Sequence, residues 1–184
     1  VPFCEYNPFE ATKTNVIGTE NMVNASLTNN VSRFLLVSTD KVVSPTSCLG
    51  ATKLLAERVV INSENIKGYK KTIFACARFG NVIGTRGSVL PYLTSQIENN
   101  QNLTVTDLNM TRYFMTINDA TNMLTESINE MKGGEIFIPR KLKLFKVIDL
   151  ANSLKKKYAK NKLKIKIIGK RPGEKIFENL VSDS

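Results

Sequence analysis

Residues 34–58 read FLLVSTDKVVSPTSCLGATKLLAER, and this stretch decides the fold. The apolar run that opens it ends in four polar residues, STDK at 38–41. A loop with proline and serine follows, and an amphipathic segment begins near Gly50. Open α/β sheets place their chemistry where a buried strand delivers polar side chains at its C-terminal end and a helix follows. The stretch is therefore our candidate active site.

Hydrophobic periodicity extends this pattern in both directions along the chain. Residues 1–8 contain two prolines and are expected to form a loop. Helical and strand spacings then alternate, with a helix at 9–27, a strand at 31–37, a helix at 49–65 and a strand at 72–77. This alternation implies right-handed crossovers and a parallel sheet, so the predicted fold class is α/β.

The second half of the chain continues with helical patterns separated by short extended pieces. We expect a helix capped by Ser88, a helix capped by Asn118 and a third helix near the basic end, at 89–98, 118–131 and 145–158. No internal repeat and no low-complexity linker divides the chain.

Composition bounds the class of protein. With 184 residues, 42% of them hydrophobic, and a mean hydropathy of -0.15, the chain suits one ordinary globular domain. Its apolar runs are shorter than the roughly 18–20 residues of a membrane-spanning helix, so we expect no membrane segment in this chain. The first residue is Val1 rather than Met, which indicates a piece of a longer protein, and any membrane association would come from the missing N-terminal part.

Cysteine and histidine content argues against a metal site. The three cysteines, Cys4, Cys48 and Cys76, are widely spaced, and the chain has no histidine to complete a usual zinc site. Reduced thiols of this kind are typical of cytoplasmic proteins, so a cytoplasmic location is expected.

The net charge of +10 is unevenly distributed. Residues 140–175 include 14 basic and 2 acidic residues, whereas the rest of the chain has 12 basic and 14 acidic ones. Such a stretch can bind nucleic acid or an anionic membrane. Because it has almost no interleaved aromatic residues for base stacking, we favour a solvated lysine-rich face that meets a phosphorylated ligand at a few positions, and no nucleic acid.

Two small groups of residues are able to carry chemistry. Asp40 and Lys41 place an acid and a base at the end of a buried strand, where they can protonate a leaving hydroxyl and remove a neighbouring proton. A solvated turn is the alternative. Lys53 lies on the same helical face as Leu49, four residues earlier. In short-chain dehydrogenases this motif is Tyr-x-x-x-Lys, so Leu49 occupies the tyrosine position. An ordinary surface charge is the alternative for Lys53.

Six segments, by their order and spacing, carry a resemblance to a known family: VPFCEYNPFEATKTNVIGTEN, STDKVVSPTSCLGATKLLAE, ARFGNVIGTRGSVLPYLTSQI, LTVTDLNMTRYFMTINDA, GGEIFIP and KRPGEKIFE. Together they resemble the C-terminal part of the UDP-N-acetylglucosamine 4,6-dehydratases, a polysaccharide-biosynthesis branch of the extended short-chain dehydrogenase/reductases. The resemblance implies the C-terminal half of a Rossmann-type parallel sheet plus a smaller substrate-binding portion. Residues 1–85 would form the first with the catalytic segment, and residues 86–184 mainly the second.

The resemblance also implies a reaction, with NAD rather than NADP as cofactor and a UDP-N-acetylhexosamine as substrate. In this family the sugar's C4 hydride passes to NAD, the 4-keto group acidifies the C5 proton, water leaves from C6, and the hydride returns there. By similarity, Thr39 contacts O4, Asp40 is the acid at the C6 hydroxyl and Lys41 is the base at C5. Lys53 would hold the nicotinamide ribose. Because Leu49 replaces the tyrosine, the acceptor of the O4 proton is open between Thr39 and a water.

The same resemblance assigns the binding residues. Asn15 matches a helix asparagine that supports the catalytic lysine. The residues beside the cofactor are Ser38, Lys53, Phe79, Asn81 and Val82. The residues beside the substrate are Asn81, Arg86, Ser88, Val89, Thr104, Thr106, Arg112, Arg171 and Glu174. In this set the threonines would bracket the uracil, the arginines at 112 and 171 would bind the diphosphate, and Glu174 would accept a hydrogen bond from the ribose.

The chain lacks one motif that this reaction requires. No G-x-G-x-x-G follows a strand, and Gly80 and Gly84 have the wrong spacing. The family places its glycine-rich loop upstream, so this chain would lack the helix N-terminus on which the NAD diphosphate rests. The resemblance further implies a homo-oligomer. Two rival hypotheses stay open: a nucleotide-sugar 4-epimerase, which does not need the Asp40–Lys41 pair, and a non-catalytic UDP-sugar-binding remnant.

Overall fold

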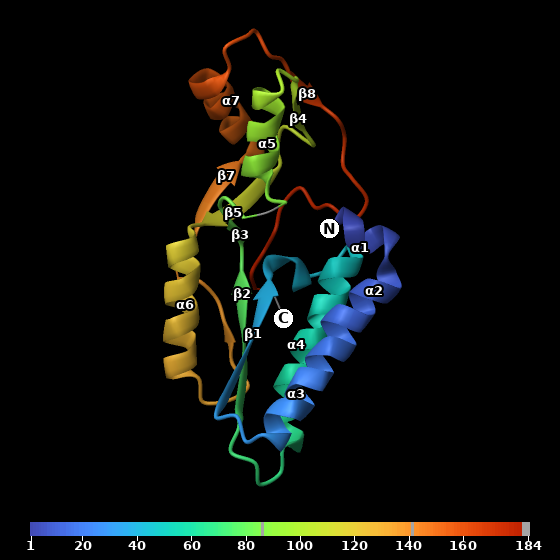
Figure 1. Ribbon diagram of the computed structural model, residues 1–184, viewed down its shortest axis with the longest axis vertical. Coiled ribbons are helices and arrows are strands. Elements are labelled where there is room, and N and C mark those ends of the chain that lie inside the picture. The colour runs from blue at the N-terminus through green and yellow to red at the C-terminus, as the bar shows by residue number, and fades with distance from the viewer. Residues whose placement is uncertain (86, 141, 182–184) are drawn as a thin grey trace.

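The molecule is elongated, with a larger part built on a parallel sheet and a smaller distal part (Figure 1). The computed structural model describes residues 1–85, 87–140 and 142–181. The larger part contains the sheet β1–β2–β6, with strands Arg33–Thr39, Ile73–Phe79 and Ile136–Phe137. One face of this sheet is covered by α4 (Cys48–Ile66), beside which lies α3 (Gly18–Thr28), and the other by α6 (Ile117–Glu130).

The register of β1 on β2 places the candidate site. The two strands are parallel, with Ser38 opposite Arg78 and Thr39 opposite Phe79, and β2 pairs in parallel with β6. Parallel strands end at one edge of a sheet, so the polar residues that follow β1 and β2 lie together. The predicted α/β class with a parallel, Rossmann-type sheet is confirmed.

Apolar residues hold the layers of this part together. Val23 of α3, Val60 of α4, and Phe74 and Cys76 of β2 form one buried cluster on the helix-covered face. A second cluster on the opposite face contains Ala77 and Phe79 of β2, packed against Met115 and against Ala120 of α6. A strand buried on both faces explains the nearly continuous apolar sequence of β2.

The N-terminal region differs from the expected loop and single helix. Residues Pro2–Tyr6 form a short helix, α1, so the prediction of a loop at 1–8 was wrong. Proline is tolerated there because the first turn of a helix has no intrahelical partner for its N–H groups. The expected helix at 9–27 is present as α2 (Pro8–Thr12), a π-helical segment (Lys13–Ile17) and α3 in succession. A π segment inside a helix often marks a functional site.

The distal part is built from α5 (Val89–Glu98), β4 (Leu103–Val105), α7 (Val147–Tyr158) and β8 (Ile165–Ile167). β4 and β8 pair in parallel, and α5 and α7 pack together around a core that includes Leu93, Leu103, Val105, Ala151 and Leu154. A second three-stranded sheet, β3–β5–β7 (Asn81–Val82, Thr111–Met115 and Lys143–Lys146), connects this part with the first (Figure 1).

Two predicted element boundaries need correction. The helix expected from an Asn118 cap begins at Ile117, because Thr116, two residues before Asn118, is the N-cap and forms a reciprocal capping box with Asp119. The helix expected at 145–158 begins at Val147, because residues 143–146 pair antiparallel with β5 as strand β7. In both places a contact within the fold, rather than the local apolar period, sets the first helical residue.

Residues 171–181, here called the C-terminal strap, run back from the distal part to the larger part (Figure 1). The backbone N–H of Thr111 donates to the carbonyl of Ile176 at 3.0 Å. Arg78 Nη1 donates to the carbonyl of Leu180 at 2.9 Å, and Thr46 Oγ1 donates to the carbonyl of Gly173 at 3.3 Å. The strap therefore connects β2, the loop before α4 and β5.

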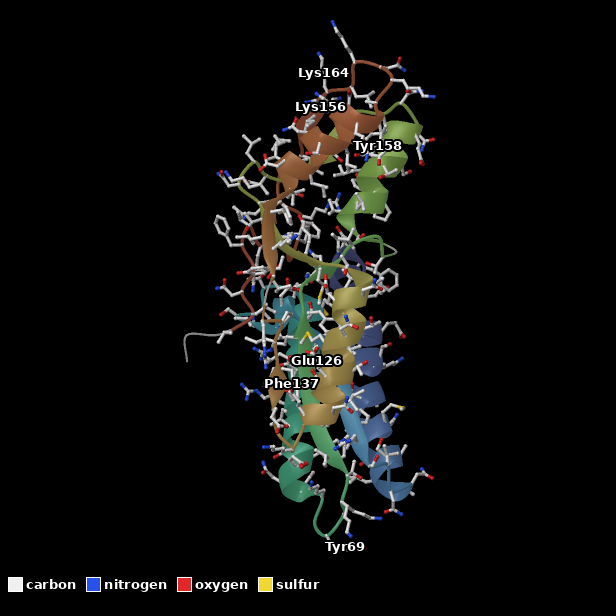
Figure 2. All side chains as sticks on the ribbon, turned by 90° about the vertical axis from the view of Figure 1, so that its left-hand side faces the viewer. Tyr69, Glu126, Phe137, Lys156, Tyr158 and Lys164 are labelled. Atoms are coloured by element: carbon white, nitrogen blue, oxygen red, sulfur yellow. The ribbon has the colours of Figure 1, made fainter. Side chains whose placement is uncertain are left out.

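The lysine-rich residues collect at the distal end. Figure 2 shows Lys156 and Lys164 at the end of the molecule opposite Tyr69. Lys155, Lys156 and Lys157 form the last turn of α7, where cations interact favourably with the helix dipole. In the described part of the chain, no helix combines the length and the apolar character needed to cross a bilayer.

The buried ion pair between Glu57 and Arg78 gives a test of the larger part, because removing one partner leaves the other charge unpaired. Glu57 is 1% exposed, and its Oε2 lies 2.8 Å from Arg78 Nη2. Substitution Arg78→Ala leaves this carboxylate buried without a countercharge and removes the bond to Leu180. We expect the free energy of unfolding in urea to fall by about 3–5 kcal/mol. The control Lys13→Ala removes an exposed pair with Glu10 and should change it by less than about 0.5 kcal/mol. Equal effects of the two substitutions would contradict this account.

Candidate active site

The side chains at the end of β1 form a compact polar group. Asp40, Lys41 and Val42 make a 3-10 turn directly after Thr39. Thr39 Oγ1 donates to Asp40 Oδ1 at 3.0 Å and accepts from the Lys41 backbone N–H at 3.4 Å. Asp40 is fully buried, and its Oδ1 lies 2.7 Å from Lys41 Nζ. Lys41 Nζ also donates to Asn81 Oδ1 of β3 at 3.4 Å. The end of β1 therefore supplies an acid and a base in contact with each other, and Asn81 of β3 contacts the base. Thr39, Asp40 and Lys41 are called the acid–base group below.

The second oxygen of Asp40 differs from the first in its surroundings. Asp40 Oδ2 is buried and accepts no hydrogen bond from the described residues. An unsatisfied buried carboxylate oxygen is costly, so natural structures retain one mainly where a ligand or a water completes it. The arrangement suits an acid whose second oxygen faces a reacting group.

The start of α4 packs directly on the Lys41 backbone. Ser47 caps this helix by accepting from the Gly50 N–H at 3.1 Å. A Cβ atom at Gly50 would collide with the Lys41 carbonyl oxygen and would lie 3.0 Å from Pro45 Cβ. Glycine is required at this position by close approach, and the approach fixes the turn that carries Lys41.

Lys53 lies one turn further along α4, beside β1. Its Nζ donates to the carbonyl of Val37 at 2.8 Å, and burial lowers the pKa of Lys53, against the opposing effects of Cys76 and Glu57. Leu49 is half-buried at the preceding turn. Asn15, in the π-helical segment, donates to Thr52 Oγ1 at 3.0 Å, so its side chain meets the neighbour of Lys53 rather than Lys53 itself.

The other residues predicted beside the cofactor lie near the same edge. Ser38 at the end of β1 and Phe79 at the end of β2 are both buried. Asn81 and Val82 form β3, which pairs with β5. The Ser38 Oγ is buried without a partner among the described residues. Gly80 has no room for a side chain, because a Cβ there would lie 2.9 Å from the Tyr113 carbonyl oxygen.

A cleft of about 510 Å³ opens between this edge and the distal part. Its lining includes Lys41 and Asn81 from the larger part. From the distal part and the strap it includes the predicted substrate residues Ser88, Val89, Thr104, Thr106, Arg112, Arg171 and Glu174. Arg86, also predicted here, lies outside the described residues. Residues far apart in the sequence are thus brought to one cleft.

The predicted uracil and ribose residues form a small network at the distal end of the cleft. Thr104 Oγ1 accepts from Gln96 Nε2 at 2.9 Å and lies 3.0 Å from the Tyr92 hydroxyl. The Arg171 guanidinium lies 5.6 Å from the centre of the Tyr92 ring, and the backbone N–H of Arg171 donates to Glu174 Oε2 at 3.1 Å. Tyr92 and Gln96 were not singled out in the sequence, although an aromatic residue followed by an amide one turn later on α5 is a detectable pattern.

The two predicted diphosphate arginines differ in their surroundings. Arg171 is exposed at the rim of the cleft, whereas Arg112 is buried. The Arg112 guanidinium donates to the backbone carbonyls of Thr111, Ile176 and Lys175 at 2.7, 3.1 and 2.8 Å. These bonds make Arg112 an anchor of the C-terminal strap, and its role in diphosphate binding stays a prediction.

One titratable residue of the cleft was missed entirely. Glu178, in the strap, is 5% exposed and lines the cleft with Lys41 and Asn81. Burial raises the pKa of Glu178, Asp40 raises it further, and Lys41, Arg112 and Lys175 oppose the rise. The only signal in the sequence was that Glu178 ends the segment KRPGEKIFE.

A second cleft, of about 850 Å³, lies between α6 and the strands β5, β6 and β7. Figure 2 shows Glu126 of α6 and Phe137 of β6, which both line it. It is larger than the first, but its lining contains neither Lys41 nor Asn81, which both line the first cleft. We therefore place the chemistry at the end of β1, where the acid–base group lies.

A family model described as "Polysaccharide biosynthesis protein" matches residues 1–184. The chain belongs to this family. An uncharacterized membrane protein of Methanocaldococcus jannaschii is 47% identical over 98% of this chain and 56% of its own length. An inverting UDP-N-acetylglucosamine 4,6-dehydratase of Campylobacter jejuni is 42% identical over 99% of this chain and 53% of its own. A UDP-glucose 4-epimerase of Rickettsia canadensis is 37% identical over the same two shares. The chain thus spans about half the length of these relatives.

Solved structures share the fold. The X-ray structure of Pen from Bacillus thuringiensis has a TM-score of 0.92 and 45% identity, over 98% of this chain and 56% of that one. DesIV, a dTDP-glucose 4,6-dehydratase from Streptomyces venezuelae with NAD and TYD bound, has a TM-score of 0.81 at 18% identity, over 90% of this chain and 56% of its own. The second likeness shows the fold alone, an extended short-chain dehydrogenase/reductase architecture of which this chain contains a part.

The close contact at Gly50 gives a test of the local structure. Gly50→Ala should push the Lys41 turn away from α4, because the added Cβ meets a backbone carbonyl. We expect a loss of about 1–3 kcal/mol in the free energy of unfolding. Gly18→Ala is the matched control, since its nearest contact, the Lys13 carbonyl, lies at an ordinary 3.4 Å, and it should stabilise by about 0.5–1 kcal/mol. A Gly50→Ala variant as stable as the native chain would refute the contact.

Proposed function

We propose that this chain is the elimination and sugar-nucleotide-binding part of an NAD-dependent 4,6-dehydratase of UDP-N-acetylhexosamines, with UDP-N-acetylglucosamine as the first candidate. The product would be a 4-keto-6-deoxy sugar for surface polysaccharide or glycan synthesis. The observation that carries the proposal is the buried Asp40, paired with Lys41 at 2.7 Å beside a cleft. The 42% identity to a protein named as such a dehydratase supports it.

Asp40 and Lys41 fit the two proton transfers of an elimination. The elimination uses Asp40 as the carboxylic acid and Lys41 as the free amine, and the two groups lie within hydrogen-bond distance of each other. The acid can donate to a leaving hydroxyl, and the amine can remove a proton next to a carbonyl.

Thr39 fits the remaining proton transfer, for which Leu49 has no suitable group. Oxidation at C4 releases the O4 proton, and elimination at C6 consumes one at Asp40. The Thr39 hydroxyl already donates to Asp40 Oδ1 at 3.0 Å. If the sugar's O4–H donates to Thr39, the proton passes through this hydroxyl to Asp40, which then protonates the leaving hydroxyl. The proton count closes without a tyrosine.

The residues present fit the nicotinamide end of the proposed cofactor. The hydroxyl of Ser38, which has no partner among the described residues, and the amine of Lys53 lie at the end of β1. There they would be able to hydrogen-bond the nicotinamide carboxamide and its ribose. When bound, NAD supplies the hydride acceptor and donor. The described residues and the sequence hold no glycine-rich loop for its diphosphate, so this half of the site must come from another part of the protein.

An epimerase is the second candidate, because a relative that is 37% identical is named UDP-glucose 4-epimerase. An epimerase needs the cofactor and a similar cleft, but it has no proton to remove at C5 and no leaving hydroxyl at C6. A buried acid paired with a lysine is therefore unexplained in an epimerase. A non-catalytic UDP-sugar-binding protein is a third reading, and it would bind UDP without binding NAD.

An activity assay with a lysine variant separates these readings. The protein at its full natural length, supplied with NAD and UDP-N-acetylglucosamine, should release a 4-keto-6-deoxy product detectable by mass spectrometry. Lys41→Ala should lower kcat at least about 10²-fold, because the C5 base is gone. Formation of the 4-epimer by both the native and the Lys41→Ala proteins would support the epimerase, and no product with NAD bound would exclude dehydration.

The proton path through Thr39 predicts a specific pair of variants. Thr39→Val keeps the shape of the side chain but removes the hydroxyl, and we expect kcat to fall about 10²-fold with a small change in KM. Thr39→Ser keeps the hydroxyl and should retain most of the activity. If the two variants have equal kcat, a water rather than Thr39 takes the O4 proton.

A further inference from the structure

We propose that the lysine-rich end of the distal part docks this protein on an anionic membrane surface. The six exposed lysines of this end are called the lysine tip: Lys156, Lys157, Lys160, Lys162, Lys164 and Lys166. The proposal does not depend on the reaction proposed above. It depends on how the fold gathers these lysines, on the lack of acidic residues between them and on their separation from the cleft.

Packing on the distal core turns the lysines outward. In α7, Leu154 is buried in this core, and exposed lysines follow it in the last turn of the helix. Leu163 and Ile165 pack against the same core, so Lys164 and Lys166, which alternate with them, face solvent. Figure 2 shows Lys156 and Lys164 at the same end of the molecule. The end of α7 and the start of β8 thus present their charge in one place.

Acidic residues do not compensate this charge. Between Asp149 and Glu174 the sequence has nine basic and no acidic residues. Within the described part of the chain, no lysine of the tip forms an ion pair. Repulsion among like charges disfavours the compact state, and an external anionic surface would relieve it.

The loop that contacts the lysine tip is made of neutral amides. It connects α5 with β4 and reads Asn-Asn-Gln-Asn at 99–102. Asn161 Nδ2 donates to Asn100 Oδ1 at 2.9 Å, and the Lys164 backbone N–H donates to Asn102 Oδ1 at 2.8 Å. Glu98, the last residue of α5, is the acid that precedes this loop. An anionic surface that approached this end would therefore meet ammonium and amide groups.

The nucleotide cleft uses little of this charge. Of the nine basic residues between Asp149 and Glu174, all of which the structure describes, Arg171 is the one that lines the first cleft. The lysines of the tip line neither the first cleft nor the second. Their charge is therefore available to a partner outside the molecule.

An anionic bilayer fits this surface better than a nucleic acid does. The tip has lysines and no arginine, although arginine is the side chain whose fork suits phosphates and base edges. Single-stranded nucleic acids also favour a basic groove with stacked aromatic residues, whereas the tip lies outside both clefts. Tyr158 is 52% exposed and Ile167 is 48% exposed, and both lie next to tip lysines in the sequence. Such side chains can enter a headgroup layer while lysines stay at its charged surface.

Docking through the tip would orient the cleft. Arg171, which lines the cleft, follows β8 after three residues, whereas the acid–base group lies in the larger part. The nucleotide end of the cleft would therefore lie closer to the membrane than the acid–base group does.

The test measures how fast single lysines react with an amine reagent, read by mass spectrometry, in the protein at its full natural length. Vesicles of phosphatidylglycerol and phosphatidylcholine in equal parts should slow the labelling of Lys166 about fivefold, because contact with the anionic surface shields the amine. Vesicles of phosphatidylcholine alone should leave it unchanged, and high salt should abolish the protection. Lys71, exposed in the larger part, should react equally in all samples. Because each lysine is read separately, the result is independent of any other membrane contact of the protein.

Two matched variants show whether the tip lysines act together. The tip variant combines Lys156→Gln, Lys160→Gln and Lys164→Gln. It should need about 10²-fold more anionic lipid to protect Lys166 by half, because lysines near an anionic surface contribute additively. The control variant removes the same charge from exposed positions of the larger part, by Arg33→Gln, Lys71→Gln and Lys132→Gln. It should change the half-protecting concentration less than about threefold, because these positions lie outside the docked end.

Three results would overturn the proposal. The first is a lack of protection of Lys166 by anionic vesicles, or equal shifts in the two variants. The second is protection by a single-stranded RNA under conditions in which the vesicles give none, which would assign the tip to nucleic acid. The third is an increase of about tenfold in KM for UDP-N-acetylglucosamine in the tip variant without vesicle protection in the native protein, which would assign the lysines to attraction of the nucleotide.

Discussion

The parallel pairing of β1 with β2 is the constraint on which the rest of the molecule depends. Because Thr39 lies opposite Phe79, the turn that carries Asp40 and Lys41 and the strand that carries Asn81 emerge at one edge, close enough for Lys41 to reach Asn81. The start of α4 and the C-terminal strap then pack against this edge. A shift of this register would separate the acid–base group from the cleft.

The site concentrates buried charge around that edge. Asp40, Glu57 and Glu178 are all 5% exposed or less. Glu57 has full compensation from Arg78, as a structural ion pair should. Asp40 and Glu178, by contrast, each retain a buried oxygen that accepts no hydrogen bond from the described residues. Asp40 is paired with Lys41 and Glu178 with Lys175, so each buried carboxylate of the cleft region has its own cation.

The sequence predicted the long helices and strands better than the element boundaries and the segments without regular structure. The periodicities of 49–65 and 72–77 gave α4 and β2 almost as they are, since long apolar patterns depend on burial alone. The start of α7 was missed because residues 143–146 pair with the distant strand β5. The Thr116 cap and helix α1 were missed for a different reason: each depends on contacts over a few residues, which an apolar period does not record. Within the site, the position of Asp40 at a strand end was predictable, whereas the burial of Glu178 depends on Arg112 and the strap. A segment without regular structure has no period that indicates which side chain points inward.

The two halves of the proposed reaction are unequally represented in this chain, for a physical reason. Elimination needs only proton-transfer groups within hydrogen-bond reach of one another, and one turn after one strand supplies them in Thr39, Asp40 and Lys41. Hydride transfer needs a binding site for the diphosphate of a dinucleotide, and this site is formed by a separate βαβ unit. The tyrosine that Leu49 replaces would take the O4 proton, and this proton links the hydride-transfer step to the elimination step. In the proposed reaction the proton released at O4 is the one that Asp40 must regain, so the Thr39 hydroxyl, which donates to Asp40, would take the place of a separate phenol.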